Sequence, residues 1–218
     1  MQIYRALVLP SACCLMLTEG CAKHSRPAPV VPSLQPGSSP SPAFAKKIQV
    51  PGLSAVGKLN DFVFRGSQPN ADGIKELKKL GITTIVDLRG ERQGTVKTER
   101  ARAEAAGMRL VSIRASGWSP PTDEQLAQFF SLLRKRPPET LYVHCWLGDD
   151  RTGVFLATYR IAFEHWTPEQ ALREMYFFHF KGFWHPSMKT YIRNFPHHFA
   201  TSPAFALYRS GTPPAPAN

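Results

Sequence analysis

The chain has 218 residues, of which 43% are apolar, so it is long enough to bury the core of one domain. Its formal net charge of +11 favours anionic partners. The basic residues form neither a block nor a stripe interleaved with aromatic side chains, and nucleic acid is therefore not expected as a partner.

The N-terminus is predicted to be a signal peptide, residues 1–21. A positive charge at Arg5 precedes an apolar run from Ala6 to Leu17, which is too short to span a bilayer comfortably. Cys21 after a small residue resembles the lipobox of bacterial lipoproteins, in which this cysteine is lipidated, although Thr18-Glu19 departs from that pattern. Ordinary cleavage nearby and an uncleaved anchor are the alternatives. All three predict export, so we expect a periplasmic protein or a membrane-anchored envelope lipoprotein of a bacterium.

Composition divides the remainder of the chain. Residues 22–51 are rich in Pro and Ser and are predicted to form a disordered tether, and residues 202–218 a similar disordered tail. A folded domain is predicted for residues 52–201. Cys145 is the only cysteine in that range, which excludes a disulfide within the domain and a cysteine-rich zinc site.

Strands are predicted to alternate with helices in this domain. The apolar, β-branched run Ile82–Leu88 is typical of a buried strand, and Thr122 and Thr167 each begin a capping box. Further strands are predicted at Phe62–Arg65, Met108–Ile113 and Leu141–His144, and helices at 70–80 with Ile74, Leu77 and Leu80 on one face, Thr95–Ala106, 122–133, Arg151–His165, from Thr167, and Ser187–Phe199. The alternation predicts an α/β fold, with a central, mostly parallel sheet flanked by helices.

The chemistry is predicted to lie directly after the last strand. Cys145 and Arg151 are separated by five residues, and a loop of this length can curl so that its N–H groups surround phosphate oxygens. Gly148 permits the backbone angles that the curl requires, and the helix that follows directs its positive end to the same point. The phosphate-binding loop is therefore expected to include His144, Trp146, Leu147, Gly148, Asp149 and Thr152.

Each reactive side chain has a predicted role. The loop favours the thiolate of Cys145, which attacks phosphorus. Arg151 offers two parallel N–H donors to phosphate, which lysine cannot match. Thr152 can hydrogen-bond the sulfur, and His144 is expected to shape the loop without transferring protons. A buried structural cysteine is the competing interpretation, but it leaves the two acids and the arginine of this turn unexplained.

The stretch HCWLGDDRTG resembles the phosphate-binding signature of the protein tyrosine and dual-specificity phosphatase superfamily. The stretches Phe64–Pro69 and Val86–Glu91 are similar to a bacterial branch of small dual-specificity-like phosphatases, and the resemblance extends over residues 59–199. It implies the cysteine-phosphatase fold and a reaction through a phosphocysteine without metal or other cofactor. It also implies phosphotyrosine or dual-specificity protein substrates, or a small anionic phosphoester.

The sequence leaves two carboxylates as candidates for the general acid that protonates the leaving group. In much of that superfamily an Asp acts from the loop after the third strand, but residues 114–121 contain no carboxylate here. Asp123 is the nearest candidate on that side, and Asp150 is favoured because some relatives, including myotubularin-like enzymes, carry Asp at this position. Arg89 is expected either to line the pocket or to pair with Glu91.

Three alternative functions are less consistent with these residues. A phosphoinositide or inositol phosphate phosphatase would favour Lys in the loop, where Asp149 and Asp150 stand. A non-catalytic phosphate-binding module would lack the nucleophile or the arginine. An arsenate-reducing or sulfur-transfer enzyme usually needs further cysteines. No metal ligation is predicted for the histidines near the C-terminus, which are His179, His185, His197 and His198.

Overall fold

The structure is a computed structural model that describes residues 43–90, 93–135 and 138–209. Within these residues one sheet has the strand order β1-β2-β3-β6-β4-β5. Strands β3, β6, β4 and β5 are parallel, and β1 and β2 pair antiparallel at one edge. The strands are β1 (Lys46–Lys47), β2 (Gly57–Lys58), β3 (Val63–Gly66), β4 (Thr84–Arg89), β5 (Arg109–Ala115) and β6 (Leu141–His144).

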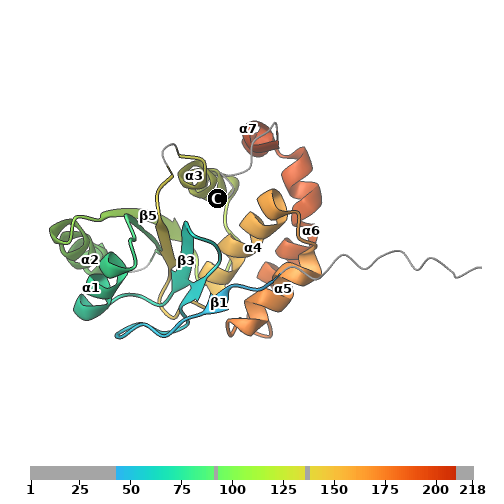
Figure 1. The fold of residues 1–218 in the computed structure, drawn as a ribbon. Helices are drawn as coiled ribbons and strands as arrows, with labels where there is room; N and C mark the ends of the chain where they lie inside the picture. Colours follow the sequence, from blue (N-terminus) through green and yellow to red (C-terminus); the bar gives the residue numbers. More distant parts are fainter. Residues whose placement is uncertain (1–42, 91–92, 136–137, 210–218) are drawn as a thin grey trace, which may run out of the picture. The chain divides into compact units, whose positions relative to one another are not determined.

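Helices cover both faces of the sheet (Figure 1). Ile85 and Tyr142 face α1 and α2, whereas their neighbours Val86 and Val143 face α3 to α6. Strands that are apolar on both sides are typical of a parallel sheet, so the predicted α/β architecture is confirmed. The helices are α1 (Ala71–Lys79), α2 (Gln93–Ala105), α3 (Asp123–Leu133), α4 (Asp150–Glu164), α5 (Pro168–Phe177), α6 (Pro186–Thr201), η1 (Pro203–Phe205) and α7 (Ala206–Arg209).

Both predicted capping boxes are present. The Thr122 hydroxyl accepts the Gln125 N–H while the Gln125 side chain accepts the Thr122 N–H, and the same exchange joins Thr167 and Gln170 at α5. Two orphan N–H groups are satisfied at each helix start, which explains why α3 and α5 begin there.

The structure differs from the predicted domain boundaries at both ends. Ala45 is buried and donates its backbone N–H to the buried Glu174 carboxylate at 2.7 Å, and β1 follows directly, so order begins before residue 52. At the other end, Phe205 is fully buried against Phe130, because η1 returns the chain to the core. A further difference concerns Leu80, which was predicted to share one helix face with Ile74 and Leu77. It is exposed, because it follows the last residue of α1 and leaves the buried face.

No helix in the described part of the chain is long and apolar enough to cross a membrane. The predicted signal peptide, Cys21 and most of the predicted tether lie outside the described residues.

Candidate active site

The predicted phosphate-binding loop joins the end of β6 to the start of α4. Cys145 follows the last strand residue and is a buried free thiol, only 4% exposed. Gly148 has φ +83°, in the left-handed region that glycine adopts without strain. Helix α4 begins at Asp150, so its unpaired N–H groups and positive end lie at the end of the same loop. Such an arrangement can bind an anion beside the thiol.

The end of β3 and the segment after it support this loop. Gln68 donates its N–H to the Trp146 carbonyl at 3.1 Å, and Arg65 Nη2 donates to the Gly148 carbonyl at 2.6 Å. Arg65 is 1% exposed and stacks on the Phe178 ring at 4.0 Å from its centroid. Burial lowers the pKa of Arg65 to about 10, against the opposing effect of nearby negative groups, so it carries a positive charge at neutral pH.

A buried polar network contacts the backbone of Cys145. His144 Nδ1 lies 2.9 Å from the Cys145 carbonyl oxygen, and its Nε2 lies 2.8 Å from Glu99 Oε1 without the alignment of a hydrogen bond. Arg89 bonds both carboxylates of the network, through Nε and Nη2 to Asp87 at 2.7 and 2.8 Å and through Nη2 to Glu99 at 2.6 Å. Helix α2 is thereby connected to the backbone of the nucleophile.

The ligand atoms of Asp87, Glu99 and His144 all lie within 4.8 Å of one another, which is close enough to hold a metal ion. The Arg89 guanidinium already bonds both carboxylates and supplies the charge that a cation would supply. These residues therefore fit a metal centre less well than they fit an ion-pair network, which positions the loop. Their grouping was not predicted from the sequence, because Glu99 lies on a helix far along the chain from His144.

Two loop carboxylates contact the segment between α5 and α6. Asp150 Oδ1 accepts the Lys181 N–H at 2.8 Å, and Oδ2 lies 3.5 Å from His185 Nε2. Asp149 lies 3.3 Å from Lys181 Nζ. Burial raises the pKa of Asp149 above its ordinary value, with Lys181 acting in the opposite direction. Both acids thus lie beside donors at one rim of the loop.

Asp123 lies in a different setting. It is at the first turn of α3, where its carboxylate accepts the Ser202 hydroxyl at 2.5 Å and contacts His198 Nε2 at 2.6 Å. These contacts join α3 to the end of α6. Asp123 therefore has a structural task independent of the phosphate-binding loop.

Exposed aromatic side chains occur in the loop itself and in two neighbouring segments. Trp146 and Leu147 belong to the loop itself and are each about half exposed. Trp118, from the segment between β5 and α3, is 72% exposed, and its ring lies 5.2 Å from that of His185, which contacts Asp150. Two further exposed aromatic residues, Phe183 and Trp184, precede His185.

The remaining predicted residues lie at the start of α4 and the end of β4. Arg151 is half-buried in the first turn of α4, and Thr152 is fully buried with a hydroxyl that has no hydrogen-bond partner. That hydroxyl is a donor available to a group bound in the loop. Arg89 lines a cavity, but this cavity lies on the α2 face of the sheet. The alternative prediction, a pair between Arg89 and Glu91, cannot be followed because Glu91 lies outside the described residues.

These features are those of the cysteine-phosphatase fold, with the predicted phosphate-binding loop between a parallel strand and a helix. The model of the family described as DSP-PTPase phosphatase fused to NAD+ kinase matches residues 52–188. This is more than half of the chain, and the chain therefore belongs to that family. The resemblance of the loop had predicted the wider dual-specificity phosphatase superfamily, which the match confirms.

Known relatives agree with this placement. The chain is 28% identical over 135 residues to the dual specificity protein phosphatase TpbA of Pseudomonas aeruginosa, a match that covers 62% of this chain and 58% of the length of TpbA. The crystal structure of P. aeruginosa TpbA aligns with a TM-score of 0.58 at 24% identity, over 75% of this chain and all of that one. The catalytic domain of the S. cerevisiae PP-IP phosphatase Siw14 aligns with the same score at 17% identity, over 67% and 88%. These structural likenesses establish the fold.

Proposed function

We propose that this protein is a cysteine-dependent phosphatase that hydrolyses phosphate monoesters through a phosphocysteine intermediate. One observation carries the proposal: the buried thiol of Cys145 follows β6, and the loop after it ends at the N-terminus of α4, where Arg151 lies in the first turn. Gly148 gives the loop its left-handed turn, and Arg65 holds that turn through the Gly148 carbonyl. Nucleophile, anion site and guanidinium thus belong to one short segment.

The reaction proceeds in two displacements. The Cys145 thiolate attacks phosphorus, an S–P bond forms, and the ester P–O bond breaks as the leaving oxygen takes a proton from a general acid. Water then attacks the phosphocysteine and gives up a proton to the same group, the S–P bond breaks, and inorganic phosphate and the thiolate are released. Arg151 and the loop N–H groups stabilise charge on the equatorial oxygens in both steps. The Thr152 hydroxyl donates to the departing sulfur.

An aromatic phosphate, such as phosphotyrosine in a protein, is the proposed substrate class. Trp146 belongs to the loop, and Trp118 contacts His185 beside Asp150; both exposed rings can stack on a phenyl leaving group. A TpbA variant has been crystallised in complex with pTyr, which supports the same class. A phosphoinositide or inositol phosphate substrate is the second candidate, and the acids Asp149 and Asp150 in the loop argue against it.

Export and lipid attachment at Cys21 are proposed from the sequence. An apolar N-terminal run followed by a small residue and cysteine supports this assignment, and several acyl chains on one cysteine would anchor the domain firmly. Fractionation of the bacterial host tests it. The protein is expected with membranes, and Cys21→Ala is expected to release it or block processing. A soluble protein with its N-terminus at another residue would refute the lipidation.

The decisive test of function is hydrolysis of para-nitrophenyl phosphate by the full chain with a chelator present. The wild type is expected to turn over, and Cys145→Ser to be inactive with an unchanged circular dichroism spectrum, since a serine hydroxyl stays protonated in the same loop. Arg151→Lys should be severely impaired, because a point charge does not replace the guanidinium fork. Phosphate binding without turnover by the wild type would instead identify a non-catalytic module.

A further inference from the structure

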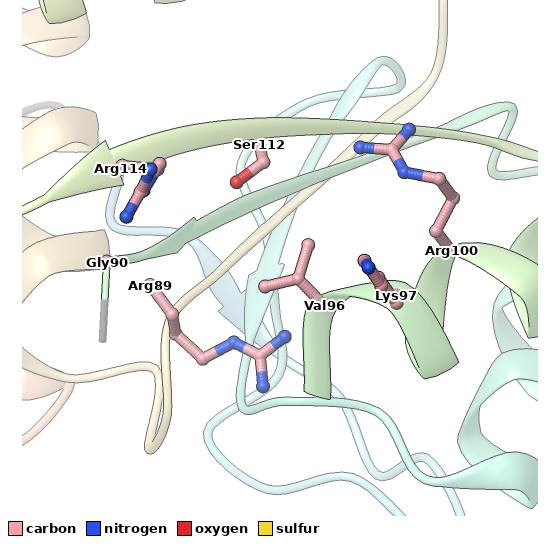
Figure 2. A pocket seen from close by; sticks show the side chains of 7 residues that line it. All are labelled: Arg89, Gly90, Val96, Lys97, Arg100, Ser112 and Arg114. Carbon is pink, nitrogen blue, oxygen red and sulfur yellow. The ribbon is translucent and has the colours of Figure 1, made fainter. Parts of the chain in front are cut away.

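A basic cavity lies on the α2 face of the sheet, beside the network of Asp87, Arg89 and Glu99. It has a volume of about 200 Å³ and is formed by the ends of β4 and β5 and by α2 (Figure 2). Among the described residues that line it, four of seven are cations and none is acidic. The cations are Arg89, Lys97, Arg100 and Arg114.

Arg89 lines this cavity and has an unused donor. Its Nε and Nη2 bond Asp87 and Glu99, whereas Nη1 is buried and has no hydrogen-bond partner, although the residue is only 3% exposed. Buried guanidinium donors are normally satisfied, because an unpaired one loses its hydration without compensation. An anion in the cavity would supply the missing acceptor.

The other cations strengthen this interpretation. Arg100 donates Nη1 to the Leu110 carbonyl at 2.7 Å, which fixes its side chain along the cavity wall. Within the described part of the chain, Lys97 and Arg114 form no ion pair with an acidic residue. Both side chains are exposed. Like charges that line one cavity repel one another, and a bound anion reduces this repulsion. The Ser112 hydroxyl lines the same cavity and is a further donor.

The cavity lies on the same edge of the sheet as the catalytic loop. Asp87 is paired with His144 in the parallel register of β4 and β6, so Arg89 and Cys145 both lie at the carboxyl ends of adjacent strands. A second, more open cavity shares Gly90 and Arg114 with the first and extends to Trp118 at the rim of the active site. The two cavities form a path along this edge.

We propose that the Arg89 cavity binds a second phosphate group, separate from the one in the catalytic loop. A phosphate fits its size, its positive charge and its convergent N–H and O–H donors. Bound there, the phosphate accepts from Arg89 Nη1 and acts on the loop through the contacts of Arg89 with Glu99 and of Glu99 with His144. Binding is independent of the phosphatase activity proposed above, whereas this effect on catalysis rests on it.

Amide spectra of the isotopically labelled full chain, titrated with inorganic phosphate, test the site directly. In the wild type, the amides of Gly90 and Ser112 are expected to shift as well as that of Gly148. In Lys97→Gln/Arg114→Gln, phosphate should bind about tenfold or more weakly at Gly90 and Ser112, because two charged donors are lost, while Gly148 still responds. The matched control is Lys75→Gln/Lys79→Gln, which removes equal charge from exposed ion pairs of α1.

Two results would overturn the proposal. The first is a wild type in which Gly90 and Ser112 do not respond to phosphate, and the second is a response equally weakened by both double variants, which would show only a general charge effect. Loss confined to Lys97→Gln/Arg114→Gln supports the site.

Kinetics then distinguish two sources of the bound phosphate, which are a second phosphate group of the substrate and free inorganic phosphate. If it is a second phosphate of the substrate, Lys97→Gln/Arg114→Gln should lower kcat/KM about tenfold for a doubly phosphorylated peptide, through lost charge-assisted bonds, but not for its singly phosphorylated form. If it is free phosphate, both peptides should be unaffected, and a non-competitive component of phosphate inhibition should disappear from the variant. A wild type inactive on para-nitrophenyl phosphate would refute the proposed function and leave the spectral test valid.

Discussion

Replacing Gly148 with alanine is predicted to displace the phosphate-binding loop. An added Cβ would lie 2.5 Å from the carbonyl carbon and oxygen of Gly66 and 2.8 Å from the Ser67 nitrogen. These are backbone atoms of the segment that supports the loop, so no side-chain rotation relieves the contact. The φ of +83° adds the cost of a left-handed conformation in a residue with a Cβ.

The two costs can be separated with a second glycine. Gly81 has φ +79°, and nothing lies within 4 Å of the position that an added Cβ would occupy, so Gly81→Ala should lose only the conformational term, about 1–2 kcal/mol. Gly148→Ala adds overpacking against backbone, and its expected loss is about 2–5 kcal/mol. For a chain of this size each kcal/mol corresponds to a fall in Tm of about 2–4 °C.

Urea unfolding and para-nitrophenyl phosphate kinetics measure the two effects. Gly81→Ala is expected to keep wild-type kcat/KM, whereas Gly148→Ala should lose about 100-fold, as expected when reacting groups are displaced by about 1 Å. Equal stability of the two variants together with wild-type kinetics for Gly148→Ala would refute the reasoning, because the close approach to Gly66 would then impose no constraint.

Two further predictions concern buried carboxylates. Glu99→Gln should lower the free energy of unfolding by about 1.5–3 kcal/mol, because it removes the carboxylate that Arg89 and His144 share and leaves Arg89 paired with Asp87 alone. Urea unfolding should show at most about 1 kcal/mol for the exposed-pair control Glu76→Gln. Burial raises the pKa of Asp149 because it disfavours the charged carboxylate. The folded state therefore binds a proton at Asp149 more tightly than the unfolded state does, and the stability that this contributes at low pH is lost as pH rises through the raised pKa. The stability of Asp149→Asn relative to wild type should therefore increase between about pH 3 and pH 7 in urea unfolding, and a pH-independent difference would contradict this.

Local sequence patterns predicted the central fold because its determinants are local. Apolar runs indicated β4 and β6, and the capping boxes at Thr122 and Thr167 indicated the starts of α3 and α5. The spacing of Cys145 and Arg151 indicated the loop between β6 and α4. Each of these signals lies within a few residues of the feature that it specifies.

The supporting residues could not be predicted because their contacts are distant in sequence. Arg65 reaches the Gly148 carbonyl across 83 positions, and Lys181 donates its N–H to Asp150 across 31. Arg65 is a charged residue within the apolar strand β3 and belongs to the stretch Phe64–Pro69 that resembles the phosphatase branch, but neither signal indicated its partner. The sequence did not predict that the fold extends beyond residues 52–201, and the reason is the same. Ala45, for example, donates its N–H to Glu174, 129 positions away.

The general acid is the remaining question for the proposed mechanism, and the structure separates the two candidates by their contacts. Asp123 is held by Ser202 and His198 and joins α3 to α6, so Asp123→Asn should affect stability more than turnover. Asp150 belongs to the loop end, beside Lys181 and His185 at the rim. We therefore propose Asp150 as the group that protonates the leaving oxygen.

A series of aryl and alkyl phosphates with leaving groups of increasing pKa distinguishes them. A poor leaving group needs a proton in the transition state, whereas an activated phenolate departs nearly unaided, and general acid catalysis contributes about two to four orders of magnitude. Asp150→Asn should therefore lose far more turnover on alkyl phosphates than on para-nitrophenyl phosphate, while Asp123→Asn should show the shallow dependence of the wild type. A steep dependence in Asp123→Asn with a shallow one in Asp150→Asn would exchange the roles. A shallow dependence in both would assign the proton to water or to Asp149, the other carboxyl group of the loop, because its raised pKa keeps a larger share protonated than an ordinary aspartate.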